Sequence, residues 1–218
     1  MENRGRIFLI VALLLVWPIA GDCAGIFAGF EFDDEEQHFY YLGLSTDGEY
    51  FFNVLASHNR YEFEDNGELR LAKIKSLSPG VGLRREGPLT WMVSAGPVVR
   101  EKDEETDEGS SSKTEIGALF QLDGFWFRDN ESLRLQATFS TLDTFLWSRL
   151  RGKKRIYGVL HGGAEVFWMG NSDFDAWGIG PILEISMEGI SAVARWGLKE
   201  SSTFNGGMYA GIELYTPL

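Results

Sequence analysis

Three polar residues, Asn171, Asp173 and Asp175, lie in the stretch GNSDFDAW between two apolar runs. Side-chain oxygens at alternate positions suit a calcium ion if the fold fixes several of them around it. Asn and Asp are equally favoured in turns, because their side chains bond the neighbouring backbone. We expect a turn at the outer tip of a hairpin, with Asn171, Asp173 and Asp175 as candidate surface-loop contacts for a cation or a glycan.

His161 and Glu165 form a second candidate pair, because residues four apart share one face of a strand. A base beside an acid is an arrangement that hydrolytic enzymes use, and the chain has only three histidines. A polar pair that lines a barrel lumen explains the same spacing without catalysis. We therefore expect no catalytic residues, no cofactor and no metal site.

The segment Glu101–Lys113, EKDEETDEGSSSK, is strongly acidic and then rich in Ser. Such composition predicts a solvated, mobile loop and not a strand. A flexible run of this kind does not fix the oxygens that a calcium site needs. The loop is therefore expected to be a solvated surface feature.

The N-terminus has a short basic stretch followed by the apolar run Ile7–Val16 and then Pro18. A membrane-spanning helix needs about 20 apolar residues, so this run is too short. We predict a cleaved signal peptide over residues 1–24 and a mature domain over residues 25–218. Acylation of Cys23 is the alternative, although Asp22 does not fit the usual lipoprotein signal.

The mature chain is acidic and lacks cysteine. Cleavage after Ala24 removes two arginines together with Glu2 and Asp22, so the net charge stays at −12. A chain with this charge and no basic tract is not expected to bind nucleic acid. Without disulfides the fold is held by packing and hydrogen bonds.

Apolar residues alternate with small or polar residues along most of the chain, which is typical of strands with two different faces. In one run Trp177 and Ile179 are apolar, whereas Gly178 and Gly180 take the opposite face. The runs cover roughly residues 26–32, 40–44, 52–56, 68–85, 89–100, 116–122, 133–139, 145–151, 156–169, 177–187, 190–196 and 208–214.

Two all-β classes compete for this pattern: a soluble sandwich or barrel, and an outer-membrane barrel. The non-apolar faces carry Gly, Ser, Thr and charges of both signs, as a lumen does. Aromatic residues near the run ends suit interfacial girdles. These are Phe30, Tyr40, Trp91, Trp177, Trp196 and Tyr209. Expected connections alternate between short turns at 46–49, 86–88, 152–155 and 187–190 and more polar segments at 33–38, 64–68, 101–113, 170–175 and 199–206.

We predict an all-β fold: an antiparallel, up-and-down transmembrane β-barrel of about twelve strands, with ten to fourteen left open, in the bacterial outer membrane. The run 68–85 places Lys73 and Lys75 in the parity of its apolar residues. Either a bulge shifts the register near residues 74–77, or this half projects beyond the apolar environment.

The charged residues of the polar faces are candidates for the lumen lining. With one histidine they are Arg84, Arg100, Glu115, Asp123, Arg134, His161, Glu165, Glu184 and Arg195. A lining of mixed sign indicates a filled or weakly selective interior, whereas a ring of one sign would indicate ion selectivity.

Several stretches carry a resemblance to a known family. They are FYYLGL (residues 39–44), SPGVGLRREGPLTWMVSAGPVVR (78–100), FLWSRLR (145–151), GGAEVFWMGNSDFDAWGIGPIL (162–183) and GGMYAGIEL (206–214). In these the chain resembles the cellulose biosynthesis outer-membrane proteins called BcsS. The resemblance implies an outer-membrane barrel that takes part in making or exporting cellulose or a similar exopolysaccharide, and it brings no catalytic residues.

The leading expectation is a non-enzymatic outer-membrane barrel accessory to cellulose or exopolysaccharide biosynthesis, export or surface attachment. Its expected partners are outer-membrane lipid and, through the resemblance, cellulose or another exopolysaccharide with its secretion machinery. A general small porin or structural barrel is the first alternative. A lipid-modifying outer-membrane enzyme is the second.

Overall fold

The computed structural model describes residues 23–33, 37–65, 68–106, 109–172, 174–202 and 206–216. Residues 1–22 of the predicted signal peptide and Asp173 lie outside the described residues. The described chain forms twelve strands and one short 3-10 helix, η1 (Leu142–Thr144). No helix in the described ranges is long and apolar enough to cross a membrane.

The strands follow one another along the chain with short connections. They are β1 (Cys23–Asp33), β2 (His38–Thr46), β3 (Tyr50–Asp65), β4 (Glu68–Arg85), β5 (Leu89–Thr106), β6 (Gly109–Arg128), β7 (Glu131–Ser140), β8 (Phe145–Tyr157), β9 (Leu160–Gly170), β10 (Asp175–Met187), β11 (Ile190–Ser201) and β12 (Gly207–Tyr215). Cys23 and Ala24, which the prediction assigned to the signal peptide, are the first residues of β1.

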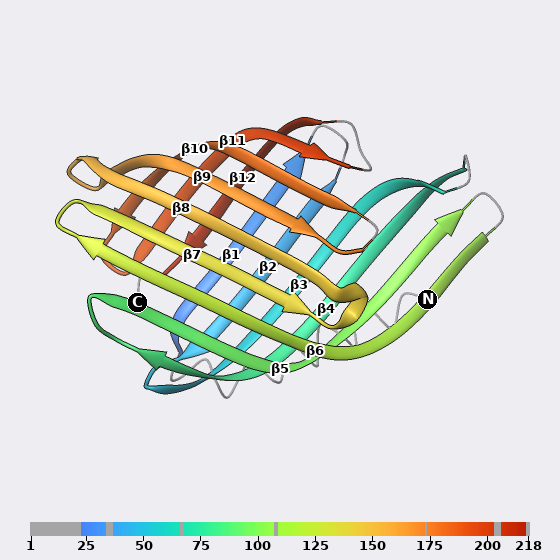
Figure 1. Cartoon of the computed structure of the whole chain (residues 1–218), viewed down its shortest axis with the longest axis horizontal. Coiled ribbons are helices and arrows are strands. Elements are labelled where there is room, and N and C mark those ends of the chain that lie inside the picture. The colour runs from blue at the N-terminus through green and yellow to red at the C-terminus, as the bar shows by residue number, and fades with distance from the viewer. Residues whose placement is uncertain are drawn as a thin grey trace.

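Each strand pairs antiparallel with its neighbours in the sequence, and β1 pairs with β12 to close the barrel (Figure 1). Phe27 is opposite Tyr215 in this closing pair, and Asp33 is opposite Tyr209. Closure leaves no strand edge with unpaired backbone groups, which would each cost several kcal/mol in lipid. The predicted twelve-stranded antiparallel barrel is confirmed.

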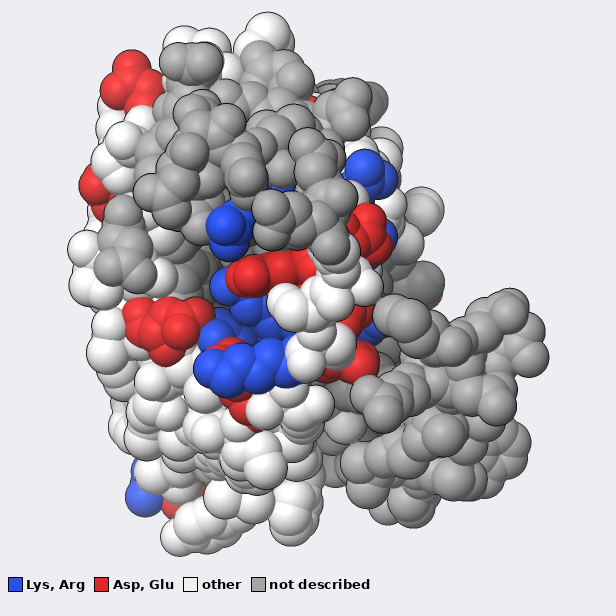
Figure 2. All heavy atoms as spheres, turned by 90° about the vertical axis from the view of Figure 1, so that its right-hand side faces the viewer, with Lys and Arg blue, Asp and Glu red and all other residues white. Residues whose placement is uncertain are grey.

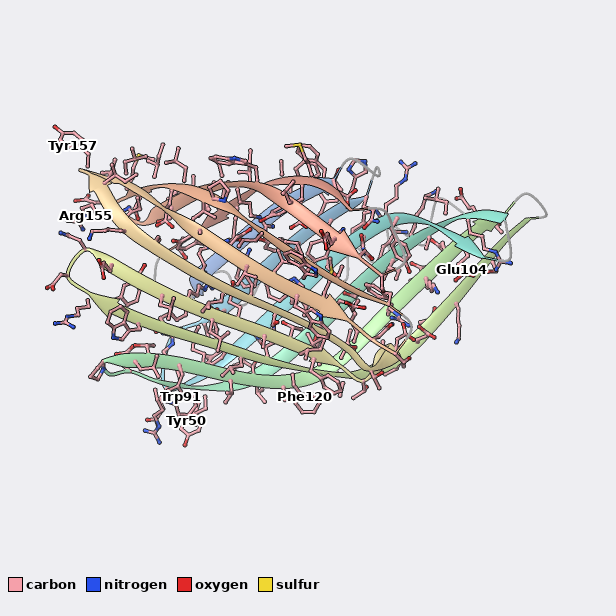
Figure 3. All side chains as sticks on the ribbon, turned by 45° about the horizontal axis from the view of Figure 1, so that its top comes forward. Tyr50, Trp91, Glu104, Phe120, Arg155 and Tyr157 are labelled. Carbon is pink, nitrogen blue, oxygen red and sulfur yellow. The ribbon has the colours of Figure 1, made fainter. Side chains whose placement is uncertain are left out.

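Alternation sorts the side chains into an outer and an inner face. Along β10 exposed and buried residues alternate with almost no interruption, and Trp177 and Ile179 are on the exposed face. Figure 3 shows the labelled side chains of Tyr50, Trp91 and Phe120 pointing away from the barrel. Tyr209 departs from the predicted aromatic girdle, because its odd position on β12 turns it inward, where it is buried.

The predicted loop over Glu101–Lys113 was wrong in its secondary structure. β5 continues to Thr106 and β6 begins at Gly109, with an unbroken ladder from Arg100 opposite Glu115 to Thr106 opposite Gly109. We call residues 100–106 and 109–115 the hairpin extension. Alternation did not reveal it because both of its faces are polar.

Strand β4 resolves the two alternatives for Lys73 and Lys75. Its pairing with β3 and β5 contains no register shift, so there is no bulge near residues 74–77. The first half of the strand instead projects beyond the apolar band, alongside the hairpin extension (Figure 1). Lys73 pairs with Glu105 there at 2.6 Å.

The predicted turn at residues 152–155 was also wrong. β8 runs on to Tyr157, and the chain reverses at Gly158, which has a positive φ of 52° that glycine adopts without strain. The polar sequence Gly152–Arg155 resembles a turn because it lies at the end of the barrel. Tight connections at 47–49, 86–88, 129–130, 158–159 and 188–189 share this end with both chain ends of the barrel. Short turns and the termini mark the periplasmic end of such barrels.

Candidate functional site

All nine predicted lumen residues lie on the inner face of the wall. Arg84, Glu165, Glu184 and Arg195 are buried. Arg100 pairs with Glu115, and Arg134 pairs with Asp123 at 2.6 Å. His161 is opposite Glu184 in the register of β9 and β10. The structure therefore brings the nine together in one interior, but it distributes them among several ion-pair groups.

The centre of the interior is organised by a residue that was not among these nine, Glu213 of β12. One of its oxygens, Oε2, accepts a hydrogen bond from Tyr41 Oη at 2.8 Å and lies 2.9 Å from Arg149 Nη1. Arg151 Nη2 donates to the same oxygen at 3.2 Å, and Arg151 Nη1 donates to Oε1 at 3.3 Å. Glu213 therefore holds three long side chains from two other strands.

Glu165 of β9 extends this cluster. Its Oε2 accepts a hydrogen bond from Arg151 Nη2 at 3.0 Å, and its Oε1 accepts one from Tyr209 Oη at 3.2 Å. Arg195 Nη1 lies 3.6 Å from Glu165, and Arg195 Nη2 lies 2.8 Å from Glu31. We call this set the central network. Its members are Glu31, Tyr41, Arg149, Arg151, Glu165, Arg195, Tyr209 and Glu213.

The central network crosses the lumen instead of coating one wall. β2, which carries Tyr41, and β8, which carries Arg149 and Arg151, are six positions apart in a ring of twelve strands. They therefore face each other across the barrel, and Glu213 contacts both. Barrels of about eight strands are filled by side chains, whereas barrels of about 16 leave an aqueous channel. Twelve strands lie between these limits, and long Arg and Glu side chains meet in the middle.

The central network is buried and its charges are balanced. Arg149, Arg151, Glu165, Arg195 and Glu213 are each no more than 4% exposed. Three arginines are matched by Glu31, Glu165 and Glu213, so the charges cancel. Burying charges is costly unless they are paired and hydrogen-bonded. The pairing therefore explains how so many ions remain inside the barrel.

A second set of contacts joins neighbouring parts of the wall nearer the periplasmic end. Lys153 Nζ of β8 donates to Glu184 of β10 at 2.5 Å and to Tyr215 Oη of β12 at 3.0 Å. The Arg134 guanidinium lies 5.7 Å from the centre of the Tyr215 ring and 4.5 Å from that of Phe125. The side of the interior formed by β7–β12 is thus occupied at two levels.

The middle of the inner face of β4 and β5 is different, because between the charged residues Arg84 and Arg100 it is built from small and uncharged residues. Asn53 Nδ2 donates to Ser94 Oγ at 3.0 Å and to Gln121 Oε1 at 2.8 Å. A Cβ at Gly96 would lie 1.9 Å from the carbonyl oxygen of Pro79, so only glycine fits this close approach of strands.

The view from the outer end shows Lys, Arg, Asp and Glu gathered at the centre of the barrel mouth (Figure 2).

The outer mouth has its own ion pairs. Arg100 bonds Glu115 and also lies 2.6 Å from Asp143, which precedes β8. Lys113 lies 2.7 Å from Glu115. Hydrogen bonds from Lys113 and Arg100 lower the pKa of Glu115, which lies in the hairpin extension outside the apolar band. Glu115 is therefore held in its charged form at the mouth.

The stretch Gly170–Trp177 contains a turn, as the sequence predicted. Asn171 Oδ1 accepts a hydrogen bond from the backbone of Phe174 at 3.0 Å, and Asn171 N donates to the Phe174 carbonyl. Asp175 is the exposed first residue of β10, and its backbone bonds Ser202. Within the described residues no group of His, Cys, Asp and Glu has the arrangement of a metal site.

His161 and Glu165 both face inward but differ in their surroundings. Glu165 bonds Arg151 and Tyr209, whereas His161 Nδ1 is buried without a hydrogen-bond partner in the described structure. Both carboxylate oxygens of Glu165 accept hydrogen bonds from arginine or tyrosine, and His161 is not among the partners in the described structure. The pair predicted from spacing is therefore two separate inward residues.

Sequence reasoning missed most of the central network. Arg149 and Arg151 alternate with Leu150 in FLWSRLR, and Glu213 has the parity of Gly211 in the last strand. Alternation therefore placed these residues on the polar face. It carried no signal that strands far apart in the sequence bring them into contact.

Comparisons with known proteins give the fold a wider context. No family model matches the chain, and no curated protein matches it. The transport unit of the Escherichia coli autotransporter AIDA-I aligns with a TM-score of 0.54 at 8% identity, over 89% of each chain. The KdgM porin aligns with a TM-score of 0.50 at 8% identity, over 89% of this chain and 99% of its own. At this identity the likeness concerns the fold alone. The chain is a twelve-stranded β-barrel of the bacterial outer membrane, with the architecture of porins and autotransporter barrels.

Proposed function

We propose that this protein is a non-enzymatic outer-membrane barrel with an interior closed by the central network, and that it serves surface cellulose or a related exopolysaccharide as an accessory. The observation that carries the closure is the contact of Glu213 with both Tyr41 and Arg151, on opposite walls. The polysaccharide role is inferred from the sequence resemblance to the BcsS proteins.

Closure favours attachment or assembly over free diffusion. A diffusion pore needs a continuous aqueous path, and such barrels line it with groups that stay hydrated. The side chains of the central network are instead buried and bonded to each other, which supports a fixed plug. A plugged barrel can still present its outer hairpins to a polysaccharide or to a partner protein.

The non-enzymatic part of the proposal draws on the surroundings of the histidines. A catalytic base needs the reacting group and an orienting acid within hydrogen-bond reach. Glu165 is bonded to Arg151 and Tyr209, and the two other histidines, His38 and His58, lie on the outer face of the barrel. This arrangement supports a structural barrel.

A narrow porin is the second candidate, and the middle of the inner face of β4 and β5 favours it. This part of the wall has only small, uncharged residues, which are Ser78, Gly80, Gly82, Ser94 and Gly96. A passage between this wall and the central network would carry small polar solutes. The two candidates differ in whether the unmodified protein conducts.

Planar-bilayer conductance tests the closure. We expect the unmodified protein to be silent, and Arg151→Ala to conduct, because it removes the side chain that joins Glu165 to Glu213. Lys154→Ala, which changes an exposed pair with Glu131, is the matched control and stays silent. A steady current through the unmodified protein that sugars block would contradict closure and support the porin.

Cell-bound and released cellulose in a deletion strain test the polysaccharide role. Loss of the gene should shift cellulose from the cell-bound to the released fraction, and both the unmodified protein and Lys154→Ala should restore it. Unchanged amounts in both fractions would contradict this role while leaving the closure intact.

A further inference from the structure

The outer face of β2, β3 and β4 carries a compact group of basic residues near the outer end of the barrel. Register places His38 opposite Arg60, and Arg60 opposite Lys73. One step nearer the periplasmic end, the next lipid-facing row of the same three strands contains Tyr40, His58 and Lys75. We call His38, His58, Arg60, Lys73 and Lys75 the outer basic cluster.

These side chains share the face that meets lipid. Phe30 stacks on Tyr40 at 4.8 Å and lies 6.3 Å from His38, and Tyr40 lies 6.1 Å from His58. Tyr40 and Phe32, on the same face, are each more than 40% exposed. The cluster is therefore on the outside of the barrel, separate from the charges of the lumen.

Its height on the barrel corresponds to the boundary of the outer leaflet. The row immediately below is Leu42, Ala56 and Leu77, and apolar residues continue from there towards the periplasmic turns. His38 is the first residue of β2 and follows an outer connection. The apolar band of such barrels is about 25 Å tall, with headgroups at each rim. The cluster lies where lipid headgroups begin.

Among the described residues, only the two lysines of the cluster have acidic partners. Lys73 and Lys75 face Glu105 and Asp103 at 2.6 and 3.8 Å. Within the described chain Arg60, which lies between His38 and Lys73, has no ion-pair or hydrogen-bond partner, and His38 Nδ1 has no hydrogen-bond partner. Because the described residues offer this cation at the edge of the apolar band no counter-charge, an anion from the membrane fits beside it.

We propose that the outer basic cluster binds the phosphate group of a lipid in the outer leaflet. Cross-strand neighbours are about 5 Å apart, so His38, Arg60 and Lys73 span about 10 Å. Guanidinium offers a planar fork that matches phosphate oxygens, and the lysine ammonium adds a point charge. The aromatic side chains of Phe30 and Tyr40 pack beside the upper acyl chains of the same lipid.

Native mass spectrometry of the full-length protein in detergent tests this proposal, with bis-phosphorylated lipid A as the probe. The unmodified protein should bind it, and the double variant Arg60→Ala/Lys73→Ala should bind about tenfold more weakly or worse, as expected for losing charge-assisted hydrogen bonds. The variant Arg85→Ala/Lys154→Ala removes two positive charges at the opposite rim and should bind as the unmodified protein does.

Three further measurements serve as controls, one for folding and two for the recognition of the lipid phosphate. Heat-modifiable migration on a detergent gel checks that each variant is a barrel. The unmodified protein should bind lipid A without phosphates poorly, and inorganic phosphate should not displace the intact lipid. Equal binding of phosphorylated and dephosphorylated lipid, or equal loss in both double variants, would overturn the proposal.

Discussion

The central network and the hairpin extension use the same chemistry in opposite surroundings. Arg149 meets Glu213 at 2.9 Å, and Lys73 meets Glu105 at 2.6 Å, so the distances are alike. The side chains of the first pair are 4% and 3% exposed, whereas those of the second are 33% and 51% exposed. Burial, and not distance, distinguishes the two regions.

The difference has a direct energetic meaning. An exposed ion pair contributes little, because water and salt screen its attraction. A buried charge that loses its partner is left without solvation, so removing one member costs far more than the pair itself contributes. Variants in the two regions should therefore differ in how much free energy of unfolding they lose and in how strongly that loss depends on salt.

The largest effect is expected for Glu213→Gln, because it leaves Arg149 and Arg151 without their shared carboxylate. We expect a loss of about 3–5 kcal/mol in the free energy of unfolding. Urea unfolding in lipid vesicles, followed by tryptophan fluorescence, measures it. A loss below about 1 kcal/mol, the size typical of an exposed pair, would show that water reaches this carboxylate.

A smaller effect is expected for Tyr41→Phe, which keeps the ring and removes the hydrogen bond to Glu213. Hydrogen bonds to charged groups contribute about 1.5–3 kcal/mol. The same unfolding assay measures this change. Additive losses in the double variant Tyr41→Phe/Glu213→Gln would be inconsistent with direct contact, because residues that share a bond couple.

Lys73→Ala, which removes the β4 partner of Glu105 in the hairpin extension, should lower stability by at most about 1 kcal/mol. The loss should vanish at about 1 M salt, where the screening length falls to about 3 Å. Unfolding at low and high salt compares this variant with Glu213→Gln, whose loss should persist. A salt-independent effect at Lys73 would mean that the extension is shielded from solvent.

The smallest effect is expected for Lys154→Ala at the periplasmic rim. Its pair with Glu131 has side chains that are 68% and 52% exposed. We expect no measurable change in the unfolding midpoint at any salt concentration. A clear destabilisation would indicate that exposure is a poor guide to the value of ion pairs in this barrel.

The same contrast explains which elements were predictable. Runs with one apolar and one polar face, such as Trp177–Met187, were found because lipid and lumen select different residues at alternate positions. The hairpin extension has polar residues on both faces and was taken for a loop. Residues 152–155 resemble a turn because they are polar, although the strand continues to Tyr157 and the chain reverses at Gly158.

For the site, the alternation of residues along each strand was sufficient to assign side chains to the inner face. It did not reveal which of these side chains contact each other. The inward positions of Arg134, Arg195 and Glu165 follow from alternation alone. Their partners do not, because Glu213 and Arg151 are 62 residues apart and meet only when the barrel closes. The outer basic cluster was missed for the same reason, since His38, Arg60 and Lys73 belong to three strands.

The sequence by itself determined that the chain forms an antiparallel barrel of about twelve strands, which face of each strand meets lipid, and that the interior is of mixed charge. These properties follow from side-chain alternation, which is local. Tertiary structure decided that the charges meet across the lumen at Glu213 and that Arg60 lies at the outer rim between His38 and Lys73, without a counter-charge among the described residues. Both depend on register and closure, because these set which residues of distant strands come within bonding distance.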